Sequence, residues 1–401
     1  MITIGSYVIV QKVESEMCKL AKVTKNCEVV VDNLKIKLNG AIGKPYGLFE
    51  VQNGNLLVTA SATEMGVSLS DLRNEGSESR KRPVERDDEE DAPPTKVSGQ
   101  LVTSKEIEDL KHAGASVKEV VSTLASGNVK FDERTTHSQD KYLSKKTKVH
   151  NDKVYILKPT IRLINTALYQ KGHERICSLR MDVFANMLYL ANVVPGCRVL
   201  VYEEVQGLVI AALIQRLEGK GELYVVYNNF DINSLFAVHA MGFKPEVLNV
   251  LRPIRWDVLN KAMLGIGPEK PIQVTADEPM EYEGDPLKEP SFDQQYIWAN
   301  ERIVNSSIMD SLLFVGDGVN ATDFLQNTLK FVRTSGSIVV HSNIESDALA
   351  LVSYLESETT VEVNVQKLMS RRMQAIQDRS HPLLTEYMPS GMLISATKVG
   401  S

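Results

Sequence analysis

The residues with the most chemical information lie between a short apolar run and the helix-like segment that follows it. Residues 198–202 are mostly apolar, residues 208–217 repeat leucine, valine and alanine at helical spacing, and residues 223–227 form a second apolar run. This alternation predicts a strand, a helix and a second, parallel strand. The turn after the first strand of such a unit is where a nucleotide-like cofactor binds, because glycines there let the backbone approach it closely.

That turn lacks most of the residues that a cofactor needs. It reads Tyr-Glu-Glu-Val-Gln-Gly-Leu over residues 202–208, so Gly207 alone remains of a glycine-rich loop. Side chains occupy positions where bare backbone and positive φ would be required, and Glu203 and Glu204 add negative charge. We interpret the turn as a cofactor position that side chains have filled. A divergent but working cofactor site is the alternative interpretation.

The end of the second strand supports the same interpretation. A cofactor that carries a ribose is usually held there by Asp or Glu, because a carboxylate accepts hydrogen bonds from both ribose hydroxyls. This strand ends in Asn228 and Asn229, which are weaker acceptors. We therefore expect this chain to bind no cofactor.

A group of lysines that precedes this unit has the chemistry of a phosphate-binding surface. Residues 139–148 read Gln-Asp-Lys-Tyr-Leu-Ser-Lys-Lys-Thr-Lys, and this spacing places lysines on one face of a helix with Tyr142 beside them. The lysines of this face are Lys141, Lys145 and Lys148, and the adjacent Lys146 is expected to contribute to the same surface. Because the chain has a net charge of −6, any contact with nucleic acid must use such local patches. A solvated charged face is the alternative.

The composition is that of a globular protein. The 401 residues are 43% hydrophobic and 24% charged, which suits two or three domains with their own cores. The four cysteines include no Cys-x-x-Cys pair, so we expect core thiols and no metal site. No apolar run reaches roughly 18 residues, and no basic region followed by an apolar one stands at the N-terminus. We therefore expect no membrane span and no secretory signal, and place the chain inside the cell.

Changes of pattern divide the first part of the chain into three segments. Residues 1–73 carry short runs rich in valine and isoleucine between glycine turns, which predicts a small β-barrel. Residues 74–98 are charged and poor in apolar residues, which predicts a disordered insertion. The Arg-Lys-Arg-Pro tetrad at residues 80–83 is either a nuclear-localisation signal or part of a solvated loop.

Residues 99–153 predict a helical linker with a basic face. Two Ser/Thr-x-x-Glu capping boxes begin at Thr103 and Ser116, on either side of Gly114, and predict two short helices. The lysine-bearing segment described above follows them.

Residues 154–401 alternate strand-like and helix-like segments. This pattern predicts an α/β, doubly wound sheet of the Rossmann type with an antiparallel end. Residues 265–290 interrupt it with five prolines and many acids, which predicts a loop. The Gly-Asp-Gly triplet at residues 316–318 follows a predicted strand; we expect a turn there, and a phosphate-cradling loop is the alternative.

Together these segments resemble class I methyltransferases that use S-adenosylmethionine. The closer resemblance is to the non-catalytic subunit of the eukaryotic tRNA (adenine-58, N1) methyltransferases, and it covers nearly the whole chain. Its most specific segments are Gln-Asp-Lys-Tyr-Leu at residues 139–143 and Arg-Ser-His-Pro at residues 379–382, supported by residues 106–115, 190–209 and 390–395.

The resemblance implies a division of labour between two chains. A catalytic partner of the same fold would bind S-adenosylmethionine and methylate the T-loop adenine of tRNA, and the two chains would assemble as an α2β2 heterotetramer in the nucleus. This chain would contribute tRNA binding and a scaffold, without catalytic residues of its own. Asp317 lies near the position of the catalytic Asp in active relatives, but its flanking glycines and the missing Pro-Ala-Pro segment make the match poor.

Basic residues near the C-terminus complete the expected RNA surface. They are Arg371, Arg372, Arg379 and His381. A guanidinium suits phosphate clamping or stacking on an extruded base. Structural ion pairs at a subunit interface are the alternative for Arg371 and Arg379. The family often has an aromatic residue where Met373 stands here, which argues against base stacking by this segment.

Two other functions remain open at this point. An active methyltransferase with a divergent site would bind S-adenosylmethionine itself. An interaction scaffold without RNA contact would leave tRNA affinity unchanged when the charges of the lysine face are reversed.

Overall fold

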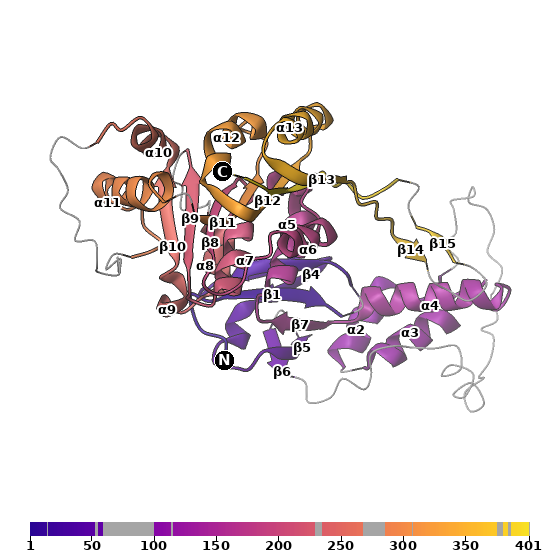
Figure 1. Ribbon diagram of the computed structural model, residues 1–401. Helices are drawn as coiled ribbons and strands as arrows, with labels where there is room; N and C mark the ends of the chain where they lie inside the picture. The colour runs from indigo at the N-terminus through magenta and orange to yellow at the C-terminus, as the bar shows by residue number, and fades with distance from the viewer. Residues whose placement is uncertain are drawn as a thin grey trace, which may run out of the picture. The chain divides into compact units, whose positions relative to one another are not determined.

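The computed structural model describes residues 1–13, 15–52, 55–58, 100–113, 115–228, 235–267, 285–306, 308–374, 380–383 and 386–400. They form two compact units, one of residues 1–5 and 10–157 and one of residues 6–9 and 158–401. Figure 1 labels their helices and strands. The insertion at 74–98 with its basic tetrad, most of the loop at 265–290, Asn229 and Arg379 lie outside the described residues.

The first unit contains a five-stranded sheet and a separate two-stranded ladder. The sheet has the order β2-β1-β7-β5-β6. Its strands are β1 (Tyr7–Lys12), β2 (Cys18–Lys22), β5 (Gly47–Gln52), β6 (Asn55–Val58) and β7 (Lys153–Leu157); β3 (Glu28–Val31) pairs with β4 (Leu34–Lys37), and η1 (Leu38–Ala41) follows. Inward-facing residues alternate with outward-facing ones, as in β7, where Val154 and Ile156 are buried. The predicted β-strands are present, and a closed barrel stays a prediction.

The boundary between the units differs from the expected one. Strand β7 begins at Lys153, next to residue 154 where we expected the second domain to begin, yet it pairs antiparallel with β5. The sheet therefore needs a strand that is about a hundred residues distant in sequence. Residues 99–153 lie between β6 and β7, two strands of one sheet that both flank β5, and belong to the first unit.

Three helices follow the insertion, and the first two begin where the capping boxes predicted. They are α2 (Ser104–His112), α3 (Val117–Ser126) and α4 (Thr136–His150). Thr103 and Ser116 both form complete capping boxes, with Glu106 and Glu119 respectively. Helices α3 and α4 pack through a small core of Val121, Ala125, Phe131 and Leu143.

Polar contacts join these helices to the sheet of the same unit. The Lys111 ammonium of α2 lies 2.6 Å from the Asp152 carboxylate, next to β7. The buried Lys12 of β1 donates a 3.0 Å hydrogen bond to the carbonyl of Val149 at the end of α4. The helices are therefore fixed to the sheet at two points.

The second unit is built on a seven-stranded sheet. Its order is β10-β9-β8-β11-β12-β16-β13, and β16 is antiparallel to both of its neighbours. The strands are β8 (Arg198–Glu203), β9 (Glu222–Tyr227), β10 (Leu251–Arg255), β11 (Met309–Val315), β12 (Val332–Ser342), β13 (Thr360–Gln366) and β16 (Met392–Lys398). Counted in chain order, the sheet reads 3-2-1-4-5-7-6. The predicted doubly wound sheet is confirmed, with its antiparallel strand one position in from the edge.

Helices cover both faces of this sheet (Figure 1). One face packs on α10 (Trp256–Met263), η4 (Trp298–Val304), α12 (Ala321–Thr328) and α13 (Glu345–Ser357), around buried side chains such as Phe314 and Phe324. The remaining segments are α5 (Ile161–Gly172), η2 (His173–Ile176), α6 (Met181–Leu190), α7 (Leu208–Leu217), α8 (Phe236–Met241), α9 (Pro245–Leu248), α11 (Phe292–Ile297) and η5 (Leu329–Phe331). Helix α7 is apolar on nearly every side, and eight of its ten residues are therefore buried.

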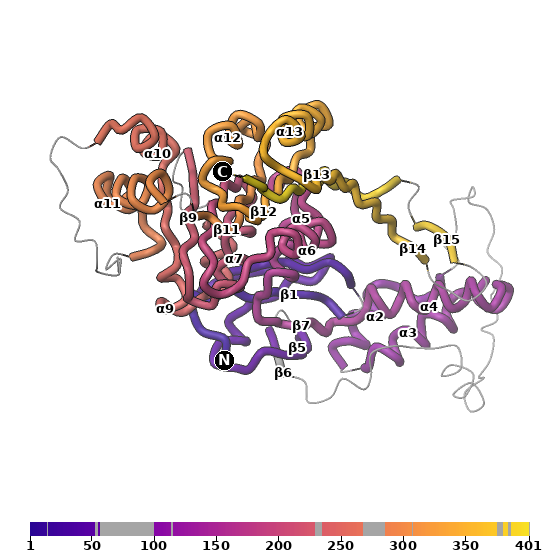
Figure 2. The backbone as a smooth tube through the Cα atoms, viewed as in Figure 1, coloured from indigo at the N-terminus to yellow at the C-terminus, as the bar shows by residue number. Residues whose placement is uncertain are grey.

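Between β13 and β16 the chain forms a two-stranded arm. Figure 2 shows the backbone leading from β13 out to β14 (Met373–Gln374), with β15 (His381–Pro382) beside β14. Strands β14 and β15 pair antiparallel, with Gln374 opposite His381. The four cysteines are free thiols, and no helix in the described ranges is long and apolar enough to cross a membrane.

Candidate functional site

The expected cofactor position lies where the strand order of the second sheet reverses. Strands β8 and β11 are neighbours there and run parallel, with Glu203 paired with Val315 at their carboxyl ends. The Glu204 amide continues the ladder with a 2.8 Å hydrogen bond to the Val315 carbonyl. In open α/β sheets, this reversal is the position at which ligands bind.

The carboxylate of Glu203 caps the helix that follows it. It accepts hydrogen bonds from the backbone amides of Val209 at 2.7 Å and Ile210 at 3.2 Å, and from Gly207. Gly207 has φ of +75°, which lets the chain turn sharply into α7 but offers no side chain for capping. Burial raises the pKa of the Glu203 carboxyl to about 7, against the opposing effect of these three amides. The amides that would face a ligand at the start of α7 are therefore used by the chain's own carboxylate.

Glu204 occupies the opposite side of the same turn. Its carboxylate accepts 3.0 and 2.8 Å hydrogen bonds from the amides of Asp317 and Gly318, in the loop after β11. A Cβ atom added to Gly318 would lie 2.6 Å from a Glu204 oxygen, and one added to Gly316 would lie 2.9 Å from the other. These glycines therefore accommodate the Glu204 side chain. The triplet is a turn that binds a carboxylate of this chain.

Tyr202, two residues earlier on β8, holds the Glu204 side chain in place. Its hydroxyl donates a 2.6 Å hydrogen bond to the Glu204 carboxylate, and its ring stacks on Phe314 at 5.0 Å and 13°. Burial and then this hydrogen bond raise the pKa of the Tyr202 phenol, so it remains a donor. The side-chain amide of Asn228, at the end of β9, lies 3.4 Å from the same hydroxyl. The residue expected at the ribose position thus turns toward Tyr202.

Other titratable groups lie around the turn without forming a catalytic arrangement. The Asp317 carboxylate accepts a 2.9 Å hydrogen bond from the Asn343 amide. Burial, and then Asp317, raise the pKa of the Cys177 thiol, which therefore remains protonated. Burial lowers the pKa of His341 to about 4, and neither of its ring nitrogens has a hydrogen-bond partner among the described residues. The Cys177 thiol hydrogen-bonds to the Asp317 side chain, but its raised pKa disfavours the thiolate that a nucleophile needs.

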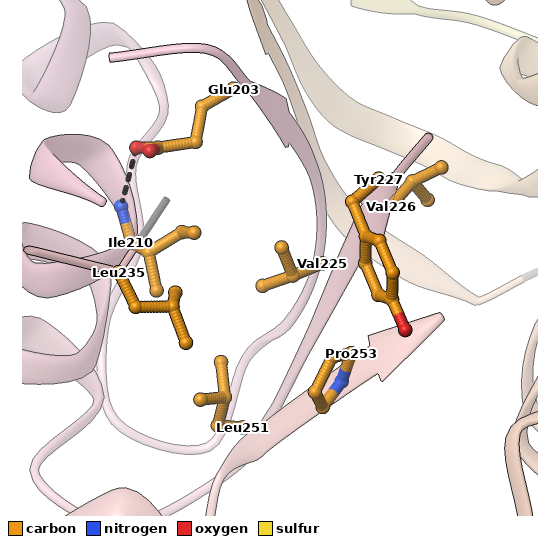
Figure 3. A pocket seen from close by; sticks show the side chains of 8 residues that line it. All are labelled: Glu203, Ile210, Val225, Val226, Tyr227, Leu235, Leu251 and Pro253. Atoms are coloured by element: carbon orange, nitrogen blue, oxygen red, sulfur yellow. Dashed lines mark hydrogen bonds between the residues drawn. The ribbon is translucent and has the colours of Figure 1, made fainter. Parts of the chain in front are cut away.

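A small pocket lies between α7 and strands β9 and β10 (Figure 3). Its lining residues are Glu203, Ile210, Val225, Val226, Tyr227, Leu235, Leu251 and Pro253. Figure 3 shows the Glu203 carboxylate turned toward the amide of Ile210. The lining is mostly apolar, so the pocket offers little to orient a polar cofactor. Across the residues that the structure describes, no three His, Cys, Asp or Glu side chains come together as metal ligands.

The lysine face of the first unit exists as predicted. Lys141, Lys145 and Lys148 are exposed on α4, at the i, i+4 and i+7 positions of one face. Lys146 is half-buried, with its ammonium 5.6 Å from the centre of the Tyr142 ring. Three of the four lysines are therefore free to neutralise phosphates, and the fourth also packs against the protein.

Tyr142 has a structural position that the sequence did not indicate. Its hydroxyl donates to the Leu124 carbonyl and to the Gln100 side chain, at 3.2 and 3.1 Å. Its ring packs against Phe131 and lies beneath the guanidinium of Arg134, 5.2 Å away. Tyr142 therefore holds α4 to α3, and Arg134 joins the basic surface that we had assigned to lysines alone.

The C-terminal basic residues lie on the arm of the second unit. Arg372 directly precedes β14 and His381 begins β15; both are exposed, while Arg371 is half-buried. The Arg371 guanidinium stacks on the ring of Tyr387, 4.2 Å from its centre. Sequence reasoning missed Tyr387, because the arm brings it beside Arg371 from 16 residues away. An aromatic partner is thus present, although Met373 replaces the one expected nearby.

The sheet order and the turn after β8 define a class: a methyltransferase-type α/β fold whose cofactor turn is occupied by its own glutamates. The structure of an S-adenosylmethionine-dependent O-methyltransferase from Thermotoga maritima matches this fold with a TM-score of 0.51 at 11% identity, covering 100% of this chain and 95% of that one. The family model described as the Gcd10p family matches residues 1–289, and the chain belongs to that family.

Curated relatives carry a more specific description. A Dictyostelium discoideum protein named as the tRNA (adenine(58)-N(1))-methyltransferase non-catalytic subunit trm6 is 27% identical, over 98% of this chain and 79% of its own length. The Mus musculus protein of the same description is 26% identical, over 99% of this chain and 88% of its own length. The resemblance inferred from the sequence is confirmed.

Proposed function

We propose that this chain is the non-catalytic subunit of a tRNA (adenine-58, N1) methyltransferase. Family membership and the names of relatives that match almost its whole length support this function. The single observation that carries the non-catalytic role is the pair of glutamates after β8. Their carboxylates accept hydrogen bonds from the backbone amides on both sides of the turn, although the sheet has all its strands in the methyltransferase-type order.

These residues do not fit S-adenosylmethionine. The sulfonium cofactor needs bare backbone beside the turn and an acceptor for its ribose hydroxyls. Here the Glu204 side chain lies between the turns after β8 and β11, and Asn228 offers an amide that already contacts Tyr202. We propose that this chain binds no cofactor and that its catalytic partner subunit holds the S-adenosylmethionine.

We propose that this chain contributes a surface that binds tRNA. Lys141, Lys145 and Lys148 form a row of exposed ammonium groups on a helix fixed to the sheet of its own unit. Such a row neutralises successive phosphates without reading sequence. Lys146, Arg371, Arg372, Arg379 and His381 are proposed to add to this surface.

We further propose an α2β2 heterotetramer with the catalytic subunit, located in the nucleus. The resemblance to the two-chain enzymes supports this assembly and location. The long edge strand β13 and the exposed apolar residues of the arm offer surface for a partner chain.

Reconstitution tests the proposal. The chain is co-expressed with a candidate catalytic partner that has an intact glycine-rich loop, and methyl transfer to tRNA is measured for each chain alone and for the complex. We expect activity from the complex only, and the same activity when Asp317→Asn is introduced into this chain. Methyl transfer by this chain alone would instead support the active, divergent enzyme.

A further inference from the structure

At the base of the C-terminal arm, one buried arginine donates hydrogen bonds to backbone carbonyls on both sides of the arm. Arg180 is 5% exposed, and its guanidinium donates to the carbonyl of Met388 at 2.6 Å and to that of Leu368 at 2.8 Å. Leu368 lies on the segment between β13 and β14, and Met388 lies on the segment between β15 and β16. The remaining guanidinium donors form a bidentate pair with Asp182, at 2.6 and 2.8 Å.

A second contact fixes the returning strand. The Tyr169 hydroxyl donates a 2.6 Å hydrogen bond to the carbonyl of Pro389. Backbone hydrogen bonds then continue the arm outward, from Met388 to Ser370 at 2.9 Å and from Leu383 to Arg372 at 2.8 Å. A buried charge is costly unless it is fully paired, so the satisfied Arg180 restricts both strands to one arrangement.

The arrangement that Arg180 imposes brings Arg371 onto Tyr387. Ser370 and Met388 are hydrogen-bonded neighbours, and Arg371 and Tyr387 are the next residues outward on each strand. The guanidinium lies 4.2 Å from the ring centre, while 53% of the Tyr387 surface is exposed. The Arg371 Nε atom is buried and has no hydrogen-bond partner among the described residues, so an anion would be bound by the terminal nitrogens of the guanidinium. A stacked guanidinium keeps its edge donors for a planar or tetrahedral anion.

We propose that Arg371 and Tyr387 form a binding site for an RNA phosphodiester, and that Arg180 is the positioning residue for this site. The proposal rests on the proposed tRNA-binding function and extends it to Tyr387 and Arg180. Charge favours RNA: of the described residues between 367 and 390, Glu386 alone is acidic, whereas Arg372 and His381 are also basic. The exposed Met373 and Leu383 would also suit a protein surface, so contact with the partner subunit is an outcome of the test.

The test measures the Kd for tRNA of the complete complex at several salt concentrations. We expect Arg371→Ala and Tyr387→Ala to weaken binding by roughly 3- to 10-fold, and Arg371→Ala to reduce the salt slope by about one. Tyr387→Phe keeps the ring and should leave the Kd unchanged. Arg162→Ala, at an exposed arginine of α5, is the control for loss of one surface charge.

A double-mutant cycle tests the role of Arg180. Arg180→Met should weaken tRNA binding as much as Arg371→Ala does, and the two together should be no worse than either, because both remove the same site. Arg180→Lys should restore part of the affinity. Tyr169→Phe, which removes one hydrogen bond without burying an unpaired charge, should give a smaller loss in the same direction.

Three results would overturn the inference. Additive losses for Arg180→Met and Arg371→Ala would show that Arg180 acts elsewhere. Dissociation of the partner subunit from Arg371→Ala at unchanged tRNA affinity of the intact complex would identify a protein contact. An unchanged Kd for Arg371→Ala, while reversal of the α4 lysines weakens binding, would reject this site and leave the proposed function intact; if neither change affects binding, the proposed tRNA-binding function fails as well.

Discussion

The hydroxyl of Tyr202 donates a 2.6 Å hydrogen bond to the carboxylate of Glu204 at the point where the strand order reverses. That carboxylate also accepts two backbone hydrogen bonds from the loop after β11. The same two turns would enclose a cofactor in an enzyme of this fold. In this chain, side chains connect them instead.

Removing this connection should lower stability. Glu204→Ala leaves the amides of Asp317 and Gly318 without their acceptor, and we expect a decrease of about 1 kcal/mol in the free energy of unfolding, since solvent reaches this exposed carboxylate. Urea unfolding measures the change. Glu356→Ala, at an exposed position of α13, is the matched control and should change stability little. Equal effects of the two changes would contradict a role for Glu204 in holding the turns together.

Glu203 should make stability depend on pH near neutrality. Its pKa is raised from the ordinary 4.5 to about 7 in the folded state, so the folded chain binds this proton more tightly than the unfolded chain. The resulting stabilisation is complete below about pH 4.5 and is lost as pH rises through about 7. Relative to Glu203→Gln, which does not titrate, the wild type should lose on the order of 3 kcal/mol between these limits. Urea unfolding of both proteins from pH 5 to pH 8 checks this; a stability difference that is constant with pH would refute it.

His341 should act in the opposite direction and at lower pH. Its pKa is lowered from 6.5 to about 4 in the folded state, so the unfolded chain binds the proton more tightly. The stabilisation is present above about pH 6.5 and is lost as pH falls through about 4. The stability of His341→Asn should therefore fall less steeply than that of the wild type below pH 6.5. Parallel curves for the two proteins would show that His341 is not held neutral by burial.

The lysine face should govern the salt dependence of tRNA binding. Reversal of Lys141, Lys145 and Lys148 to Glu should lower affinity at least several-fold and reduce the salt slope by about three units, one for each phosphate that is no longer neutralised. Lys146 is left in place because it packs on Tyr142. A control with the same charge change reverses Lys171, Lys220 and Lys244, which are exposed in the second unit. The prediction fails if both triple variants weaken binding equally.

Much of this architecture follows from local pattern. Alternating strand-like and helix-like segments predicted the second sheet, and both capping boxes predicted helix starts at Thr103 and Ser116. The missing glycines after β8 predicted a cofactor position that side chains have filled. They could not show that Glu203 caps α7 and that Glu204 binds the next loop, because those contacts depend on how β8 and β11 pair.

The remaining features depend on partners distant in sequence. Strand β7 resembles the start of the second domain, but its pairing with β5, about a hundred residues earlier, decides its place. Tyr387 stacks on Arg371 where Arg180 holds both sides of the arm through its hydrogen bonds. No local spacing in the sequence indicates this contact. Contacts of this kind are set by tertiary structure, and the sequence pattern contains no periodicity that marks them.

The most direct measurement of the central claim is a calorimetric titration of S-adenosylmethionine into this chain, alone and in complex with its catalytic partner. We predict no saturable binding to the chain alone up to about 1 mM, and one bound cofactor for each catalytic subunit in the complex. Stoichiometric micromolar binding to the chain alone, abolished when Asn228 is replaced by alanine, would show a working cofactor site and contradict the account.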